Sequence, residues 1–270
     1  MVSSPGEGRA PFREFETWYR IVEDPSAPGR GRAPVLLLHG GPGATHDYLS
    51  PLAELGSGGR TVVFYDQIGN GRSTHLPGRG AEFWTVELFV AELANLLDHL
   101  GIGDGYHILG QSWGGLLAQE HALRQPMGLR SLILSNTAAS YSAFAAEANR
   151  LRAELPLEVE ATLRRHEAGG TTEDPEFRAA GDVFYHRHLC RLDPWPAGVS
   201  DGLAQIDLDP TVYHTINRPS EFHITGSARG WSAEARLGEI RVPTLIASGR
   251  FDEATPALQQ TLLRGIAGSR

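Results

Sequence analysis

Short apolar runs recur along the chain at intervals that predict the strands of a buried sheet. Five of them lack the alternation of a half-buried strand and therefore predict parallel strands covered on both faces. They are "PVLLLHG" at 34–40, "TVVFYD" at 61–66, "YHILGQ" at 106–111, "SLILSN" at 131–136 and "VPTLIASG" at 242–249. By contrast, "FETWYRI" at 15–21 alternates apolar and polar residues, which predicts a half-buried, antiparallel leading strand.

A helical pattern separates two of these runs. Apolar residues recur at steps of three and four over residues 86–100, as in an amphipathic helix, and Gly101 is a residue suited to end it. Strands that alternate with helices predict an α/β fold with a doubly wound, mostly parallel sheet and right-handed crossovers. The pattern leaves the order of the strands open.

The alternation is interrupted over residues 138–230, where polar, helix-favouring segments replace the apolar runs. Prolines divide this region into short helices, because proline ends or kinks a helix. These prolines are Pro156, Pro175, Pro194, Pro196 and Pro210. An insertion here would lie over the carboxyl edge of the sheet, where α/β sheets bind ligands. We therefore expect a core made of residues 1–137 and 231–270, with a helical cap over 138–230.

Composition excludes several classes of function. The 24 Lys and Arg residues against 32 Asp and Glu residues give a net charge of −8, which argues against nucleic acid as a partner. Cys190 is the only cysteine, so no intrachain disulfide can form and a reducing, cytoplasmic setting is expected. The start lacks the apolar core of a signal peptide, and no run reaches the roughly 18 apolar residues of a membrane span. We expect no membrane association.

A candidate nucleophile lies in "GQSWG" at 110–114, which fits G-x-S-x-G. The match alone is weak, but it falls between a predicted strand and a helix-like segment. Glycines on both sides allow a strained turn that exposes the Ser112 hydroxyl at the edge of the sheet.

Two further segments have the chemistry that a serine nucleophile needs. "HGGPG" at 39–43 follows a predicted strand, and its glycines let backbone N–H groups approach a carbonyl oxygen that becomes negative during acyl transfer. Asp252 follows the strand predicted at 242–249, in the order nucleophile then acid that α/β-hydrolases have. The alternatives are a simple glycine-rich turn and a solvated turn aspartate.

Together these segments resemble the proline iminopeptidase family of serine aminopeptidases, which have the α/β-hydrolase fold, and especially the tricorn-interacting aminopeptidase type. The resemblance extends from about residue 12 onwards and includes the cap. It rests on "LLHGGPGATHDYL", "VVFYDQIGNGRS", "GQSWGG", "FYHRHL", "EFHITG" and "GRFDEATP". "HGGPG" combined with "GQSWGG" is specific to this family and its amino-acid amidase relatives, whereas the cap matches are less specific.

The resemblance implies roles for individual residues. Ser112 would be the nucleophile and Asp252 the triad acid, and the backbone N–H groups of Gly41 and Trp113 would form the oxyanion hole. A second set would bind the free α-amino group of the substrate.

This amine-binding set consists of Glu221 in the cap and Glu253 directly after the triad acid. An ammonium group that loses water needs charged acceptors. The alternative is that both are ordinary surface carboxylates. No metal or cofactor is expected: His186 and His188 lie in a predicted helix, where residues two apart do not share a face, and we expect them to be cap structure. Asp66 is expected to hold a loop.

The triad base is missing from the pattern. The chain has eleven histidines and none follows His223, so none follows Asp252, where the fold places the base after one more strand. Either the sequence is a truncated version of a longer hydrolase, without the last strand and helix, or a histidine such as His223 replaces the base. We expect truncation and a chain that is nearly inactive, because loss of the base alone lowers turnover by about a millionfold.

The leading hypothesis is therefore a serine hydrolase that forms an acyl-enzyme and releases an N-terminal residue, such as proline, from short peptides or amino-acid amides. An esterase or lactonase without amine recognition is one alternative. A binding protein that keeps the hydrolase fold without catalysis is another. The sequence leaves the oligomeric state and the preferred N-terminal residue open.

Overall fold

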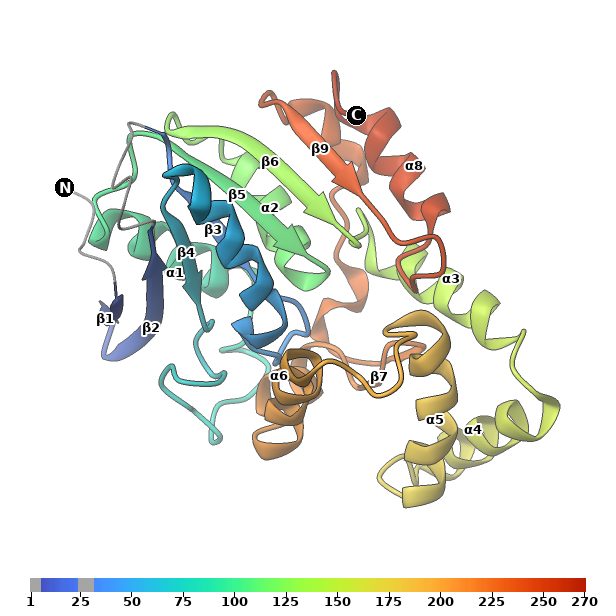
Figure 1. Ribbon diagram of the computed structural model, residues 1–270. Coiled ribbons are helices and arrows are strands. Elements are labelled where there is room, and N and C mark those ends of the chain that lie inside the picture. The colour runs from blue at the N-terminus through green and yellow to red at the C-terminus, as the bar shows by residue number, and fades with distance from the viewer. Residues whose placement is uncertain (1–5, 24–31) are drawn as a thin grey trace.

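The computed structural model describes residues 6–23 and 32–270 (Figure 1). Its main sheet has the strand order β1-β2-β4-β3-β5-β6-β9. The strands are β1 (Gly6–Phe12), β2 (Phe15–Val22), β3 (Val35–Leu38), β4 (Val62–Tyr65), β5 (Tyr106–Gln111), β6 (Leu129–Ser135) and β9 (Thr244–Ala247). From β4 to β9 neighbouring strands are parallel, whereas β2 pairs antiparallel with both β1 and β4. The predicted mostly parallel α/β sheet is confirmed.

Helices cover both faces of the sheet, and the alternation of side chains along β3 shows why. Leu36 and Leu38 belong to a large apolar cluster that includes helices α1 (Val86–His99) and α2 (Trp113–Leu123). Val35 and Leu37 point to the other face, into a cluster with Leu49 of the 3-10 helix η1 (His46–Gly58). Each β3 residue is at most 3% exposed, as its uninterrupted apolar sequence predicts.

The ends of α1 follow from its sequence. The Thr85 side chain accepts a hydrogen bond from the Leu88 N–H at the start of the helix. Gly101, just past the end, has a φ of 64°, a left-handed conformation that glycine adopts without strain. The predicted helix over 86–100 is therefore confirmed to within one residue.

Strand β9 differs from its prediction. The run at 242–249 predicts a strand buried on both faces, yet Leu245 in β9 is 44% exposed. The reason is its place at the end of the strand order, where β6 is its neighbour in the sheet. On the outer edge, Arg270 donates its N–H to the Thr244 carbonyl and accepts from the Ile246 N–H.

The region between β6 and β9 is mainly helical, as predicted. Its helices are α3 (Tyr141–Arg152), α4 (Leu157–Gly169), α5 (Pro175–His188), α6 (Ala197–Leu208), α7 (Thr211–Ile216), η2 (Ser227–Gly230) and η3 (Glu234–Glu239). Pro156, Pro196 and Pro210 are N-cap residues and Pro175 occupies the first turn of α5, so these prolines begin helices. The two-stranded hairpin of β7 (Pro219–Ser220) and β8 (His223–Ile224) was not expected.

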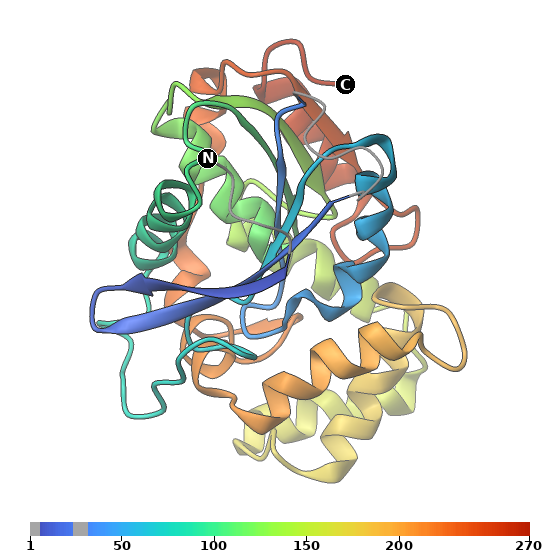
Figure 2. The same cartoon turned by 60° about the vertical axis from the view of Figure 1, so that its left-hand side comes forward.

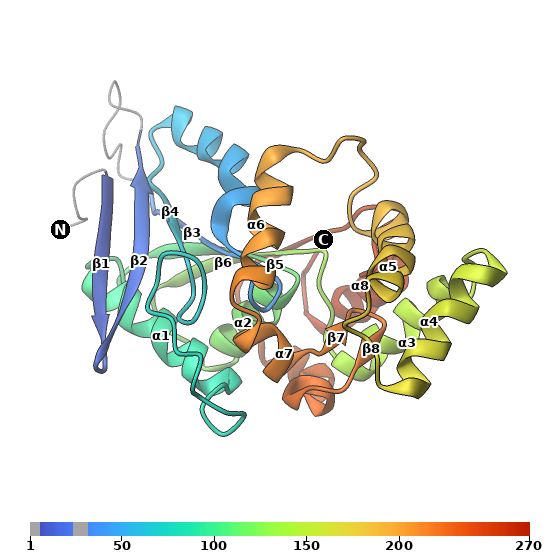
Figure 3. The ribbon, with the colours of Figure 1, turned by 90° about the horizontal axis from the view of Figure 1, so that it is seen from below.

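The helices α3 to α7 lie beyond the carboxyl ends of the parallel strands. The arrowheads of β5, β6 and β9 point toward them in Figure 1, and Figure 2 shows the yellow and orange helices of this region together below the sheet. Figure 3, seen from below, looks onto these helices, with α6 and α7 near the centre and α3, α4 and α5 to the right. Helices α3, α4 and α5 share their own apolar cluster, which includes Phe222 of the hairpin turn. The helix α8 (Pro256–Gly265) follows β9. Among the described residues, no helix is long and apolar enough to cross a membrane.

A buried arginine joins three elements of the cap. The Arg152 side chain is 4% exposed and donates to Glu160 at 2.6 Å and to both oxygens of Glu167 at 2.7 and 2.9 Å. Its guanidinium carbon also lies 5.1 Å from the centre of the Phe222 ring. The pairing therefore links α3 and α4 to the hairpin turn.

We expect Arg152→Met to lower the free energy of unfolding by about 3 to 5 kcal/mol, because two largely buried carboxylates lose their partner. Arg150→Met is the matched control: this arginine is 51% exposed, and its ion pairs should contribute at most about 1 kcal/mol. Urea unfolding monitored by circular dichroism measures both variants. Equal losses would show that the buried pairing has no special role.

Candidate active site

Ser112 lies in the turn between β5 and α2. Its φ of 52° and ψ of −119° are unusual for a residue other than glycine, so the turn is strained. The strand-to-helix turn needs both flanking glycines: a Cβ at Gly110 would lie 2.3 Å from the Gly114 carbonyl oxygen, and one at Gly114 would lie 2.1 Å from the Leu38 carbonyl oxygen. This local geometry is the one that "GQSWG" predicts.

The two predicted oxyanion donors lie beside this serine. Gly41, Trp113 and Ser112 line the same pocket, although they come from the β3–η1 loop and the start of α2. The Gly40 N–H donates to the Tyr48 hydroxyl, which donates in turn to Gln111 Oε1 at 2.6 Å. Within the described part of the chain, the N–H groups of Gly41 and Trp113 donate to no acceptor. Both donors are thus available to a bound ligand.

Asp252 lies in the loop after β9, near the carboxyl end of β6. Its Oδ2 accepts from the Asn136 side chain, which also lines the pocket, and its Oδ1 accepts from the Ala254 N–H at 2.8 Å. Burial raises the pKa of Asp252 to about 6, while these two hydrogen bonds act in the opposite direction.

No histidine in residues 6–23 and 32–270 forms a hydrogen bond with Asp252 or Ser112. His223, considered above as a substitute base, has its Nδ1 3.8 Å from Glu167 Oε1 and lines a different cavity of the cap. The structure therefore does not bring His223 to Ser112.

The two predicted amine-binding glutamates come from different parts of the chain but lie close to each other, Glu253 buried and Glu221 half-buried. Glu221 lies in the turn of the β7–β8 hairpin and lines the pocket with Ser112. Its Oε1 accepts from the Tyr213 hydroxyl at 2.8 Å and from Asn217 Nδ2 at 3.2 Å. Glu253 is 6% exposed, and its Oε2 has no partner among the described residues.

Both glutamates hold their protons more tightly than usual. Burial raises the pKa of Glu221 to about 7, although the hydrogen bonds from Tyr213 and Asn217 lower it. Burial, followed by the charges of Glu221 and Asp252, raises the pKa of Glu253 well above its usual range. A cationic ligand would stabilise both carboxylates, so this part of the pocket is suited to an ammonium group.

Residues of the cap contact the loop after β9 that contains Asp252 and Glu253, called the acid loop below. The Glu253 N–H donates to the His188 carbonyl at 2.9 Å, and His188 Nδ1 donates to the Phe251 carbonyl at 3.0 Å. The Arg191 guanidinium lies 4.0 Å from the centre of the Phe251 ring. His186 instead accepts from Trp195 Nε1 at 3.2 Å. Both histidines of "HRH" are therefore part of the cap structure, as expected.

Asp66 is also a structural residue, as expected. Its Oδ1 accepts from the His46 N–H at 3.0 Å and lies 2.8 Å from His46 Nδ1, while its Oδ2 accepts from the Arg72 N–H at 3.0 Å. These contacts lower the pKa of Asp66 against the effect of its burial. A carboxylate therefore joins the start of η1 to the loop after β4.

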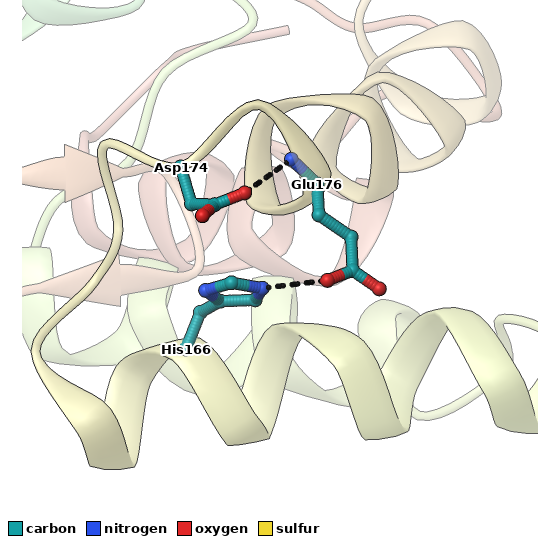
Figure 4. A group of neighbouring side chains, drawn as sticks. All are labelled: His166, Asp174 and Glu176. Carbon is teal, nitrogen blue, oxygen red and sulfur yellow. Dashed lines mark hydrogen bonds and ion pairs between the residues drawn. The ribbon is translucent and has the colours of Figure 1, made fainter.

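One group of side chains has the composition of a metal site. His166, Asp174 and Glu176 have ligand atoms within 4.8 Å of one another, on α4 and at the start of α5 (Figure 4). Their other contacts explain them without an ion: Asp174 caps α5 by accepting from the Glu176 N–H, and Glu176 pairs with Arg165 at 2.7 Å. None of the three lines the pocket of Ser112.

Sequence reasoning missed several residues of the pocket. Tyr213 and Asn217 orient Glu221, and Asn136 binds Asp252. Asn136 follows β6, so its position at the carboxyl end of a strand was a signal that could have revealed it. The residues of α7 offered no such signal, because the contact depends on the hairpin turn that follows.

Comparison with known proteins shows the family to which this chain is similar. A family model described as "alpha/beta hydrolase fold" matches residues 33–266. The proline iminopeptidase of Lactobacillus helveticus is 38% identical over 267 residues, which are 98% of this chain and 88% of that protein. The proline iminopeptidase of Thermoplasma volcanium is 37% identical over 239 residues, which are 88% of this chain and 80% of that protein.

Two solved structures are also similar to this chain. The crystal structure of VinJ has a TM-score of 0.94 and 48% identity, and the match covers all of this chain and 90% of VinJ. The proline iminopeptidase of Mycobacterium smegmatis has a TM-score of 0.87 and 44% identity, covering 98% of this chain and 88% of that one. The chain therefore belongs to the proline iminopeptidase family of hydrolases, which have the α/β-hydrolase fold.

Proposed function

We propose that this chain is built to bind a substrate with a free α-amino group and to transfer its acyl group to Ser112. The products would be an N-terminal residue, such as proline, and a shortened peptide or the amine of an amino-acid amide. The observation that carries the proposal is a pair of neighbouring glutamates, the half-buried Glu221 and the buried Glu253, beside the pocket of Ser112. Membership of the proline iminopeptidase family supports it. Cys190, as the single cysteine, supports a cytoplasmic setting.

The proposed chemistry begins with the attack of Ser112 Oγ on the carbonyl carbon of the first residue. A bond forms between these atoms, and the carbonyl oxygen becomes an oxyanion that accepts hydrogen bonds from the N–H groups of Gly41 and Trp113. The serine proton passes to a base, for which water or added imidazole would serve here, with Asp252 to orient it. The bond between the carbonyl carbon and the leaving nitrogen then breaks, and the leaving amine takes up this proton. Water finally releases the acyl group from Ser112.

Amine recognition separates this proposal from an esterase or lactonase. Placing Glu221 and Glu253 near Asp252 is costly, because each acid loses some of its water and repels the others when charged. An enzyme for neutral esters gains nothing from this arrangement. The structural likeness to an enol-lactonase, at 22% identity and a TM-score of 0.61, concerns the fold alone.

The chain is expected to hydrolyse such substrates slowly. We expect the chain to hydrolyse L-proline p-nitroanilide at less than about a thousandth of the turnover number of the Mycobacterium smegmatis relative, because no described histidine reaches Ser112. Added imidazole should raise the Ser112-dependent rate by at least about tenfold, since general base catalysis contributes about 10²- to 10⁴-fold. Steady-state assays with Ser112→Ala as the control measure this. A rate above that limit without imidazole would contradict the expectation.

A second candidate is a binding protein that holds an amine without reacting with it. The absence of a described histidine beside Asp252 and Ser112 favours it. The turnover assay with imidazole, combined with a measurement of L-prolinamide binding, decides between the two candidates. A chain that binds L-prolinamide but shows no imidazole-dependent turnover through Ser112 would be a binding protein.

Amine recognition itself is tested by Glu221→Gln. This variant keeps the size of the side chain but loses its charge, so L-prolinamide should bind about 10- to 100-fold more weakly, the equivalent of one charge-assisted hydrogen bond. N-acetyl-L-prolinamide, which lacks the ammonium, should show no such loss. Isothermal titration calorimetry measures both ligands, with the exposed Glu239→Gln as the matched control. Equal losses for the two ligands would contradict the proposed role of Glu221.

A further inference from the structure

Gln67 connects two segments of the active site and has no assigned role. It follows β4 and is fully buried. Its backbone N–H donates to His39 Nε2 at 3.0 Å, and its side-chain Nε2 donates to the His39 carbonyl at 2.9 Å. Its Oε1 accepts from the indole Nε1 of Trp113 at 2.9 Å. One residue thus bonds both to the strand end that leads into Gly41 and to the first residue of α2.

The state of His39 strengthens the first of these links. His39 Nδ1 lies 2.9 Å from the Gly40 carbonyl, which can only accept, so Nδ1 carries the proton. Nε2 is then free to accept from the Gln67 N–H. Burial lowers the pKa of His39, which keeps the ring neutral and this tautomer in place. The turn before Gly41 is therefore held by a pair of complementary hydrogen bonds.

The residues directly before and after Gln67 are also fixed by hydrogen bonds. Asp66, directly before it, binds the His46 and Arg72 N–H groups, and the Ile68 N–H, directly after it, donates to the buried Glu92 at 2.8 Å. The residues on both sides of Gln67 are therefore held by hydrogen bonds of their own.

We propose that Gln67 is a positioning residue that fixes the spacing between the N–H groups of Gly41 and Trp113, the two donors of the oxyanion hole. This inference rests on the proposed function, which assigns those donors. Gly41 has a φ of 108° and no side chain, so it has no side-chain contact of its own to fix the position of its N–H. Two donors from separate segments stabilise an oxyanion only when both reach it at about 2.7 to 3.1 Å. Gln67 joins the segments through buried hydrogen bonds.

A tetrahedral probe separates positioning of the oxyanion hole from a merely structural role. Pyrrolidine-2-boronic acid has the amine of proline, and its boron forms a bond with Ser112 Oγ. The serine hydroxyl proton leaves to solvent, and boron becomes a tetrahedral anion whose hydroxyl lies where the oxyanion would form. L-prolinamide occupies the same amine site without forming this anion. Gln67→Leu should therefore weaken boronate binding by about a hundredfold, the effect of a displacement of about 1 Å, and change L-prolinamide binding less than about threefold.

Two further variants complete the design. Trp113→Phe replaces the indole with a smaller ring, which removes the N–H that donates to Gln67 but keeps the backbone donor. It should therefore reproduce the selective loss even if Gln67→Leu does not fold. Tyr106→Phe is the matched control, because it removes a buried hydrogen bond to His121 Nε2, 2.7 Å long, at the opposite end of β5. It should leave the binding of both ligands unchanged.

The outcomes are distinguishable by calorimetry. If the wild-type chain binds the boronate no more tightly than Ser112→Ala does, the proposed oxyanion hole fails, and the role of Gln67 fails with it. If the wild-type chain does bind it more tightly, but Gln67→Leu and Trp113→Phe bind it equally well, only the role of Gln67 is overturned. Parallel losses for the boronate and L-prolinamide would likewise overturn it, because they indicate general damage to the pocket.

Discussion

The site depends on three carboxyl groups that lie beside one pocket and have lost water, Glu253 by full burial and Asp252 and Glu221 by partial burial. Asp252, Glu253 and Glu221 all have raised pKa values, with burial as the main cause. In the described residues, none of them forms an ion pair with an arginine or histidine. Such an arrangement opposes folding. It is held by neutral donors instead, among them Asn136 and Tyr213, which leaves the charges available to a cationic ligand.

The parallel sheet brings the candidate site residues together. Gln111 of β5 is in register with Ser135 of β6, and Ser135 is in register with Ala247 of β9. The residues that follow these strand ends, including Ser112 and Asp252, therefore emerge at one edge of the sheet. The cap contributes Glu221 to the pocket at this edge. It also contacts the acid loop through His188 of α5. Three distant stretches of sequence thus form one pocket.

The sequence predicted the parts of the fold that depend on local patterns. The buried run of β3, the stripe of α1 with Gly101 at its end, and the prolines that begin the cap helices all have local physical causes. The exposed Leu245 could not be predicted, because exposure depends on the order of strands in the sheet. The family resemblance indicated Glu221 from the sequence. The contact between Gln67 and Trp113 could not be predicted, because it depends on how distant segments fold together.

The most direct test of amine recognition by Glu221 and Glu253 is to count the protons that leave when the amine binds. The binding enthalpy of L-prolinamide at pH 7, measured in buffers with different ionisation enthalpies, gives this number. Glu221 has a pKa near 7 and that of Glu253 lies well above its usual range, so the free site holds protons that an ammonium ligand displaces. We expect release of at least about half a proton per ligand. No release, or proton uptake, would contradict the account.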